Sequence, residues 1–163
     1  RTLITRVPSS KSAIILLSNT ESNELREMTI AINGILYGQP YDFPKKSIAT
    51  SLSKVIESDG ITAGIAFFAL AKDDSKYYIE EQEMVIAGYE LLQKDQAKEA
   101  AAVFELAIQA FPDAFNVYDS YGEVLMALGE NEKAIENYQK SIKLNPDNEN
   151  GKRMLEKLGV KTE

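Results

Sequence analysis

The sequence predicts a mainly helical fold, in which helix–turn–helix repeats of the α-solenoid type follow a β-hairpin and one helix. Three observations support this fold class. A set of small, apolar and proline residues recurs with a period of 34 from residue 80 onward. Residues 45–71 have a helical pattern, whereas segments typical of strands are confined to residues 2–18.

The composition excludes several kinds of active site. The chain has 163 residues and contains neither cysteine nor histidine. Disulfides, thiolate or histidine metal sites and a Ser-His-Asp triad are therefore impossible within it, and we expect no cofactor. The net charge is −7, all of it carried by residues 45–163. Such an acidic surface argues against nucleic acids and anionic membranes as partners, and no apolar run is long enough to span a bilayer.

The first part of the chain predicts two strands and a helix. Residues 2–18 form the predicted hairpin, and its second strand, Ala13–Leu17, is continuously apolar, which is typical of a strand buried on both faces. A two-stranded hairpin is marginal alone, so we expect a larger domain on its N-terminal side. Arg1 is not an initiator methionine, and the chain is expected to be processed or cut from something longer. Asn19 or Thr20 caps a predicted helix from residue 21 to about residue 36.

Glycine and proline then divide the chain into regions. The predicted organisation is a terminal hairpin and helix (1–38), a linker (39–44), a degenerate helical pair (45–79), and two repeats with a cap helix (80–163). Within the pair, helices are predicted over 45–57 and 60–71, on either side of Asp59 and Gly60. Residues 73–78 are predicted to be a short irregular link.

The period of 34 is carried by six matched positions. Small residues allow the two helices of a unit to approach closely, aromatic residues fill the space between units, and prolines end the second helix. The matched pairs are Gly88 and Gly122, Leu91 and Leu125, Ala100 and Ala134, Phe104 and Tyr138, Ile108 and Ile142, and Pro112 and Pro146.

This pattern resembles the tetratricopeptide (TPR) repeat, with units over residues 81–114 and 115–148 and a cap helix over 149–158. The first unit departs from the family pattern, since Met84 replaces the usual aromatic residue and Ala87 the usual leucine. Counting back 34 residues from Ala100 and Phe104 leads to Ala66 and Leu70, so the preceding helical pair is a candidate third unit; whether it is one stays open.

The N-terminal part resembles a different family. Residues 3–7, 13–20 and 24–38 are similar to the end of the serine β-lactamase and penicillin-binding-protein-like hydrolase domain. The resemblance implies that the hairpin closes the central sheet of that domain and that the chain is the helical tail of a bacterial, extracytoplasmic serine hydrolase. Its nucleophile would then lie upstream of Arg1.

The chain contains motifs that superficially match the catalytic signature of that family. Ser51 and Lys54 have the spacing of its Ser-x-x-Lys element, followed by a Tyr-x-Ser element at Tyr118 and by Lys161-Thr162. Ser51 and Lys54 lie in a predicted helix without a neighbouring sheet, and the repeat register explains Tyr118 by packing. We therefore expect no catalytic site here, and an independent serine hydrolase using Ser51 and Lys54 is the alternative hypothesis.

The resemblance to TPR repeats implies a concave groove lined by the first helix of each unit. Repeat register, with the cap helix, gives these groove candidates: Gln82, Val85, Tyr89, Gln93, Asn116, Asp119, Glu123, Met126 and Arg153. A merely solvated face is the alternative. Because Asp119 and Glu123 would repel a carboxylate, a groove ligand should be neutral or basic.

The sequence is consistent with three kinds of partner. The first is a protein or peptide in the groove, and the second is the chain's own upstream hydrolase domain. The third is a second copy of the chain, paired through the unprotected strand edges of residues 2–18.

Overall fold

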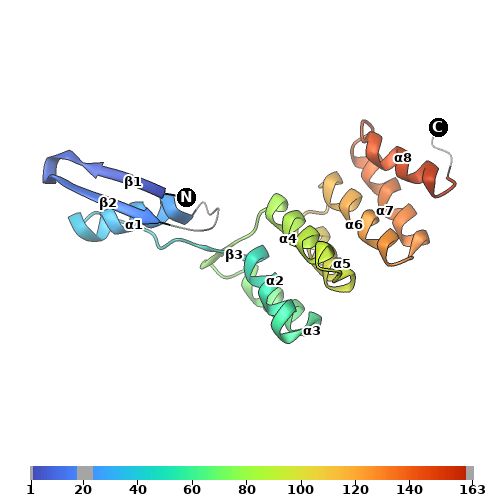
Figure 1. Ribbon diagram of the computed structural model, residues 1–163, viewed down its shortest axis with the longest axis horizontal. Helices are drawn as coiled ribbons and strands as arrows, with labels where there is room; N and C mark the ends of the chain where they lie inside the picture. The colour runs from blue at the N-terminus through green and yellow to red at the C-terminus, as the bar shows by residue number, and fades with distance from the viewer. Residues whose placement is uncertain (1, 18–23, 161–163) are drawn as a thin grey trace. The chain divides into compact units, whose positions relative to one another are not determined.

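The computed structural model describes residues 2–17 and 24–160. The chain forms two compact units, residues 1–46 and 47–163. The first holds a β-hairpin with one helix, and the second is built of helices, as Figure 1 shows for each unit. Within the described part, no helix is long and apolar enough to cross a membrane. The predicted caps Asn19 and Thr20 lie outside the described residues.

The hairpin of the first unit consists of β1 (Thr2–Val7) and β2 (Ser12–Leu17), which pair antiparallel with Ile4 opposite Ile15. A short 3-10 turn joins them, and Lys11 closes it in the left-handed conformation with φ 52°. Helix α1 (Glu24–Tyr37) packs on one face of the hairpin.

The expectation that the second strand is buried on both faces is wrong for this chain. Side chains alternate across a strand, and α1 covers only one side. Ile14 is therefore buried, whereas Ile15 and Leu17 are 60% and 76% exposed. On the facing strand, Ile4 is exposed on the same side as Ile15.

The segment after α1 turns back onto that helix. The Gln39 amide donates a hydrogen bond to the Gly34 carbonyl at 2.9 Å. A Cβ atom at Gly34 would lie 2.6 Å from Cβ of Tyr41, so only glycine permits this approach. The residues predicted to be a linker are thus folded against the helix that precedes them.

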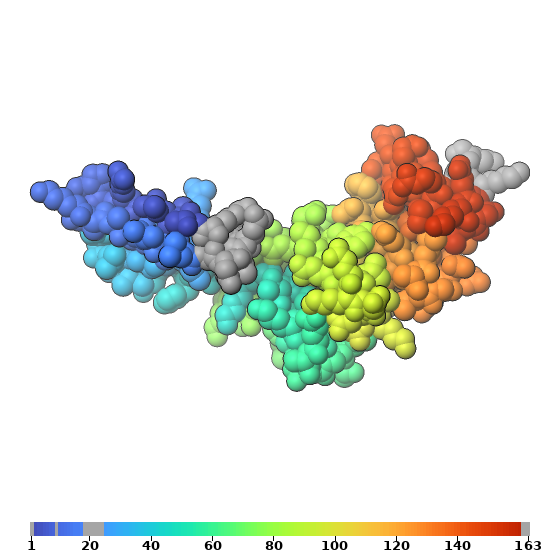
Figure 2. All heavy atoms as spheres, in the orientation of Figure 1, coloured from blue at the N-terminus to red at the C-terminus, as the bar shows by residue number. Residues whose placement is uncertain are grey.

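The second unit is a succession of antiparallel helical pairs (Figure 1). In the space-filling view their colours follow one another in chain order (Figure 2). Its helices are α2 (Ile48–Asp59), α3 (Ile61–Ala71), α4 (Glu81–Gln93), α5 (Ala97–Ala110), α6 (Phe115–Ala127), α7 (Asn131–Leu144) and α8 (Glu149–Lys157). Two short strands, β3 (Lys46–Ser47) and β4 (Tyr77–Tyr78), pair with each other. The prolines at 112 and 146 follow the ends of α5 and α7, as the repeat predicts.

Close glycine–aromatic contacts hold the two helices of each TPR-like unit together. A Cβ atom built on Gly88 would lie 2.4 Å from the Phe104 ring, and one on Gly122 would lie 2.8 Å from the Tyr138 ring. Both rings are fully buried. The period of 34 therefore corresponds to a repeated contact between the first and the second helix of a unit.

The pair formed by α2 and α3 is related to the next pair by 36 residues. Gly64, Phe68 and Ala71 are buried and lie 36 residues before Ala100, Phe104 and Ala107, which are buried too. The two residues reached by counting back 34, Ala66 and Leu70, are exposed, and Leu70 is 78% exposed. The register expected for this pair is thus wrong by two residues.

In the pair α2 and α3 the closely packed glycine lies on the second helix, not on the first. A Cβ atom at Gly64, on α3, would lie 2.3 Å from Ile56 and 3.3 Å from Leu52, both on α2. In the later pairs the glycine is on the first helix and the large side chain on the second. The same close packing is therefore achieved with the roles of the two helices exchanged.

A partly buried hydrogen-bond cluster fixes the start of α2 to α4. Ser47 caps α2, since its Oγ accepts from the Thr50 amide at 3.2 Å, and the same hydroxyl donates to Oε2 of Glu83 at 2.5 Å. The Tyr78 hydroxyl donates to the other Glu83 oxygen at 2.9 Å. Glu83 thereby ties the first helical pair to the repeats that follow.

Candidate functional site

A hollow of about 580 Å³ lies along α4 and α6 of the second unit. Amide, carboxylate and apolar side chains line it. The lining residues are Gln82, Val85, Ile86, Tyr89, Glu90, Gln93, Asn116, Asp119 and Ser120. The two helices are the first helices of consecutive units, so the repeat itself brings residues about 34 apart to the same surface.

Tyr89 joins the two helices that form the hollow. Its hydroxyl donates a hydrogen bond to Oε2 of Glu123 at 2.7 Å, and these residues are 34 apart in the sequence. The ring meets Phe104 edge to face, with centroids 5.8 Å apart. Burial, together with the neighbouring Glu123 carboxylate, raises the pKa of Tyr89 to about 12. The phenol is thus neutral at physiological pH.

Asp119 connects the hollow to the cap helix α8. Its Oδ1 accepts from Nδ2 of Asn148 at 2.8 Å, and its Oδ2 accepts from Nδ2 of Asn150 at 2.7 Å. Arg153 donates to Oδ1 of Asn150 at 2.5 Å. The Asn150 side chain therefore bridges two charged residues: it donates a hydrogen bond to Asp119 and accepts one from Arg153.

Asn148 has a second role at the start of α8. Its Oδ1 accepts from the Gly151 amide at 3.1 Å, which is an N-cap hydrogen bond, and its Nδ2 also donates to the buried Ser141 hydroxyl at 2.7 Å. Ser141 in turn donates to the Phe115 carbonyl at 2.8 Å. One asparagine side chain thus links the ends of α6, α7 and α8.

The structure gathers six of the groove candidates around one hollow. These are Gln82, Val85, Tyr89, Gln93, Asn116 and Asp119. Glu123 and Arg153 are exposed and hydrogen-bonded to groups at its edge, whereas Met126 packs into the core, where its Sδ accepts from the Tyr138 hydroxyl at 3.6 Å. The repeat register did not point to Ile86, Glu90 and Ser120, although each is one residue from a named candidate and a wider helical stripe includes them.

The serine and lysine of the Ser-x-x-Lys motif do not form a catalytic pair. Ser51 Oγ donates to the carbonyl of Ser47, the N-cap of α2, at 2.8 Å, and Lys54 is exposed. The Tyr118 hydroxyl donates to the Pro112 carbonyl at 3.0 Å, and the Lys140 ammonium lies 5.6 Å from the centre of its ring. Tyr118 is thus engaged in the repeat, while Lys161 and Thr162 lie outside the described residues.

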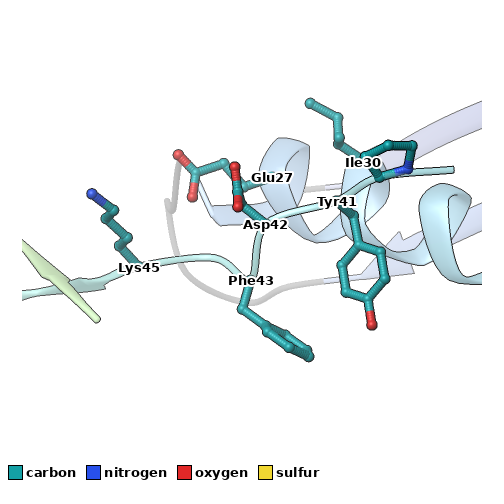
Figure 3. Close-up of a pocket in the computed structure, with 7 residues that line it drawn as sticks. Glu27, Ile30, Tyr41, Asp42, Phe43 and Lys45 are labelled. Carbon is teal, nitrogen blue, oxygen red and sulfur yellow. The ribbon is translucent and has the colours of Figure 1, made fainter. Parts of the chain in front are cut away.

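A second hollow, of about 480 Å³, lies in the first unit between α1 and the segment that folds back on it. In Figure 3 the carboxylates of Glu27 and Asp42 point to one side of this segment, while the rings of Tyr41 and Phe43 extend to the other. The two rings contact each other edge to face at 5.4 Å. Acids and rings therefore do not converge on one ligand position.

Over residues 2–17 and 24–160, no group of three or more acidic side chains is placed to hold a metal ion. The carboxylates in the groove instead accept hydrogen bonds from neutral donors of the chain, as Asp119 and Glu123 do. The chemistry that the groove offers is therefore hydrogen bonding, apolar contact and negative charge.

Comparison with known proteins assigns the repeat type. Residues 122–151 match the family model described as the TPR repeat. Over these residues the repeat is of the TPR type. A solved structure of a MamA mutant has a TM-score of 0.51 at 19% identity, covering 69% of this chain and 83% of that one.

Two structures of the first TPR domain of RPAP3 have lower TM-scores. The human domain and the domain bound to an HSP90 peptide each have a TM-score of 0.49 at 17% identity, covering 69% of this chain and 87% of theirs. No curated protein matches the chain. At these identities the structural likeness shows the fold alone.

Proposed function

We propose that the chain is a non-catalytic protein-interaction module, and that the hollow along α4 and α6 holds an extended, neutral or basic polypeptide segment. The observation that carries this proposal is the composition of the hollow. Its charged lining residues are both acidic, Glu90 and Asp119, and the rest are amides, a serine hydroxyl, a phenol and apolar side chains.

These groups suit a peptide backbone. Gln82, Gln93 and Asn116 each offer a donor and an acceptor, which is what an extended backbone needs on one edge. Ile86, which is 47% exposed, together with Val85 gives an apolar surface for one side chain of the segment. Burial of that side chain would add a hydrophobic contribution to the hydrogen bonds.

Charge determines which segment fits best. Arg153 already bonds to Asn150, which bonds to Asp119, so the positive charge of Arg153 is engaged at the edge of the hollow. Glu90 and Glu123 then leave a negative potential around the Tyr89 ring. A lysine or arginine of the ligand is attracted to this region, and a C-terminal carboxylate is repelled.

The test uses three fluorescein-labelled peptides of equal length with glycine–serine backbones, which carry two lysines, two glutamates or no charge. We expect fluorescence anisotropy to show the order lysine, neutral, glutamate in decreasing affinity. Glu90→Gln should weaken binding of the lysine peptide, and Asn116→Ala that of the lysine and neutral peptides. Glu132→Gln on α7, an exposed acid outside the hollow, is the matched control. Equal affinities for all three peptides, or equal effects of E90Q and E132Q, would contradict the proposal.

The finer proposal concerns the protein to which the module belongs. We infer from residues 3–7, 13–20 and 24–38 that it is the C-terminal tail of a bacterial serine hydrolase of the β-lactamase-like type, in the extracytoplasmic space. The DNA preceding the codon for Arg1 should then encode a strand with Lys-Thr-Gly or His-x-Gly. A different upstream sequence would refute the hydrolase context and leave the groove proposal intact.

In such a protein the tail has two possible ligands, a separate partner or its own hydrolase domain. The two are distinguished by expressing the hydrolase domain separately and testing whether it co-purifies with residues 1–163. If it does, and if E90Q abolishes co-purification, the groove holds a segment of the hydrolase domain. If it does not co-purify, the groove ligand is another protein.

A further inference from the structure

Helices α2 and α4 lie side by side and run in the same direction. Where they start, the Ser47 hydroxyl donates to Glu83 at 2.5 Å. Where they end, the ammonium of Lys94, the residue after α4, pairs with Glu57 of α2 at 2.6 Å. These partners are 36 and 37 residues apart, in agreement with the register of 36 between the two pairs. Helix α2 is therefore the next first helix beside the hollow along α4 and α6.

The surface that lines the hollow on α4 continues onto α2. Thirty-six residues before the α4 residues Val85, Ile86, Tyr89 and Glu90 stand Ala49, Thr50, Ser53 and Lys54. Burial agrees at all four positions: in both helices the first residue is buried, the third is partly buried, and the second and fourth are exposed. On α2 this surface is smaller and more polar, and a lysine stands where α4 has a glutamate.

The charge of Lys54 is not engaged within the chain. Glu57, one turn further along α2, is paired with Lys94 instead. Asp59 lies about 140° further round the helix and accepts a hydrogen bond from the Ser58 hydroxyl. Over residues 2–17 and 24–160, the Lys54 ammonium has neither an ion-pair nor a hydrogen-bond partner. The two lysines and Glu57 thus leave a net positive charge on this part of α2.

The sign of the charge therefore changes along the groove surface, from negative at Glu90 and Asp119 to positive at Lys54. We propose that Lys54 is a specificity-determining residue, which binds an aspartate or glutamate side chain of the same polypeptide segment whose basic residue faces Glu90. This inference rests on the proposed function, because it requires that segment in the hollow. It also gives the lysine of the Ser-x-x-Lys motif a role in binding, not in catalysis.

Helix geometry sets the distance between the two charged residues of the ligand. Neighbouring packed helices are about 8–10 Å apart, so groups that face Glu90 and Lys54 are separated by about that distance. In a polyproline II segment, residues three apart lie on the same side and are about 9 Å apart. The acidic and basic residues of the ligand should therefore be separated by two other residues.

The polar surface of α2 suits a short acidic side chain. Thr50 is exposed, and the Ser53 hydroxyl donates to the Ala49 carbonyl at 3.1 Å. Neither residue offers the apolar contact that Ile86 gives on α4. Because Lys54 is exposed, the ion pair is screened by water, and we expect the acidic residue to raise affinity by about two- to five-fold.

The first test measures fluorescence anisotropy with fluorescein-labelled glycine–serine peptides that are amidated at the C-terminus, so that only side chains carry charge. One peptide has a single lysine, and two others add a glutamate three residues before or after it, since the segment can run in either direction. We expect one of the two orders to bind about two- to five-fold tighter than the same peptide with glutamine in place of glutamate. Lys54→Gln should remove this gain without weakening binding of the lysine-only peptide. Lys98→Gln, at an exposed position on the second helix α5, is the matched control and should keep the gain.

The second test reverses the charge. Lys54→Glu should make a lysine at the same ligand position favourable and the glutamate unfavourable, and circular dichroism should show an unchanged fold because the side chain is exposed. If the lysine-only peptide does not bind the wild type, the proposed function fails and this inference fails with it. If that peptide binds and E90Q weakens it, three results overturn the role of Lys54 alone: no gain from glutamate in either order, equal effects of K54Q and K98Q, or an unchanged preference in K54E.

Discussion

Gly88 lies so close to the ring of Phe104 that a Cβ atom at Gly88 would come within 2.4 Å of the ring. The relationship recurs between Gly122 and Tyr138, one unit later. In both units the glycine of the first helix has no side chain, and the aromatic ring of the second helix occupies the space that a side chain would need. The stability of the repeats therefore depends on these two glycines more than on any exposed residue.

Replacing the second of these glycines should unfold the repeats. Gly122→Leu forces α6 away from α7, and overpacking of this kind costs about 1–3 kcal/mol. We expect a clearly lower midpoint of thermal unfolding, measured by circular dichroism. Ala127→Leu, at the exposed end of the same helix, is the control and should change the midpoint little. An unchanged midpoint for G122L would show that the two helices do not pack at this residue.

Removing the Asn148 side chain should loosen the cap helix. Asn148→Ala deletes the N-cap of α8, a loss of about 0.5–2 kcal/mol, and also leaves Ser141 and Asp119 without one donor each. Hydrogen exchange should become faster in α8 while α4 and α5 keep their protection. Asn137→Ala, whose amide bonds only to the carbonyl one turn earlier in α7, is the control. Equal exchange in the two variants would contradict the role given to Asn148.

Alkaline pH should destabilise the second unit. Burial raises the pKa of Tyr89 to about 12 from the ordinary value of 10.0. Burial also raises the pKa of Tyr121 and of Tyr138. Between these pH values the unfolded chain releases phenol protons that the folded chain retains, so the free energy of unfolding falls as the pH rises from about 10 to about 12.

The check on this pH dependence is urea denaturation on either side of pH 10. Tyr89→Phe cannot ionise, so its stability should fall less steeply with pH than that of the wild type. Parallel pH profiles for the two proteins would mean that Tyr89 ionises equally easily in the folded and unfolded chains.

The chain should be inactive as a hydrolase. The Ser51 hydroxyl donates a hydrogen bond to the carbonyl of Ser47, the N-cap of its helix, and Lys54 of the same motif is exposed. We expect no turnover of nitrocefin or of a p-nitrophenyl ester above the uncatalysed rate. Turnover that disappears in Ser51→Ala would establish the alternative, an independent serine hydrolase.

The hairpin remains a candidate for self-association through residues 2–18. Ile4, Ile15 and Leu17 are exposed on one face, and neither of its strands has a second strand partner among residues 2–17 and 24–46. Light scattering after size-exclusion chromatography should show a smaller assembly for a chain starting at Asn19 than for residues 1–163. Equal masses for the two, with the hairpin protected from hydrogen exchange in the longer chain, would exclude assembly through it.

Periodicity explains what the sequence could predict. Gly122, Ala134, Tyr138 and Pro146 recur at a fixed offset because each makes the same contact in every unit, so the repeats could be placed without a structure. The register of the pair α2 and α3 could not be predicted in this way. Two extra residues precede α4, and the glycine of this pair, Gly64, lies on its second helix.

The groove was predictable in part for the same reason. Tyr89 and Glu123 occupy the same repeat position in consecutive units, and the structure joins them by a hydrogen bond. Asn148 and Asn150 gave no signal, since asparagines after a proline are also typical of an ordinary turn and cap. Their link to Asp119 depends on how α8 folds back, which the repeat pattern does not specify.

The two amides on Asp119 make the cap helix a competitor for anything that enters the groove. A cation that binds the carboxylate of Asp119 weakens the hydrogen bonds that Asn148 and Asn150 donate to it, and the first of these residues also caps α8. Occupancy of the groove and order of the C-terminal helix are then thermodynamically linked, with opposite sign. Binding of a ligand between α4 and α6 would thus change how often α8, at the far end of the chain, unfolds locally.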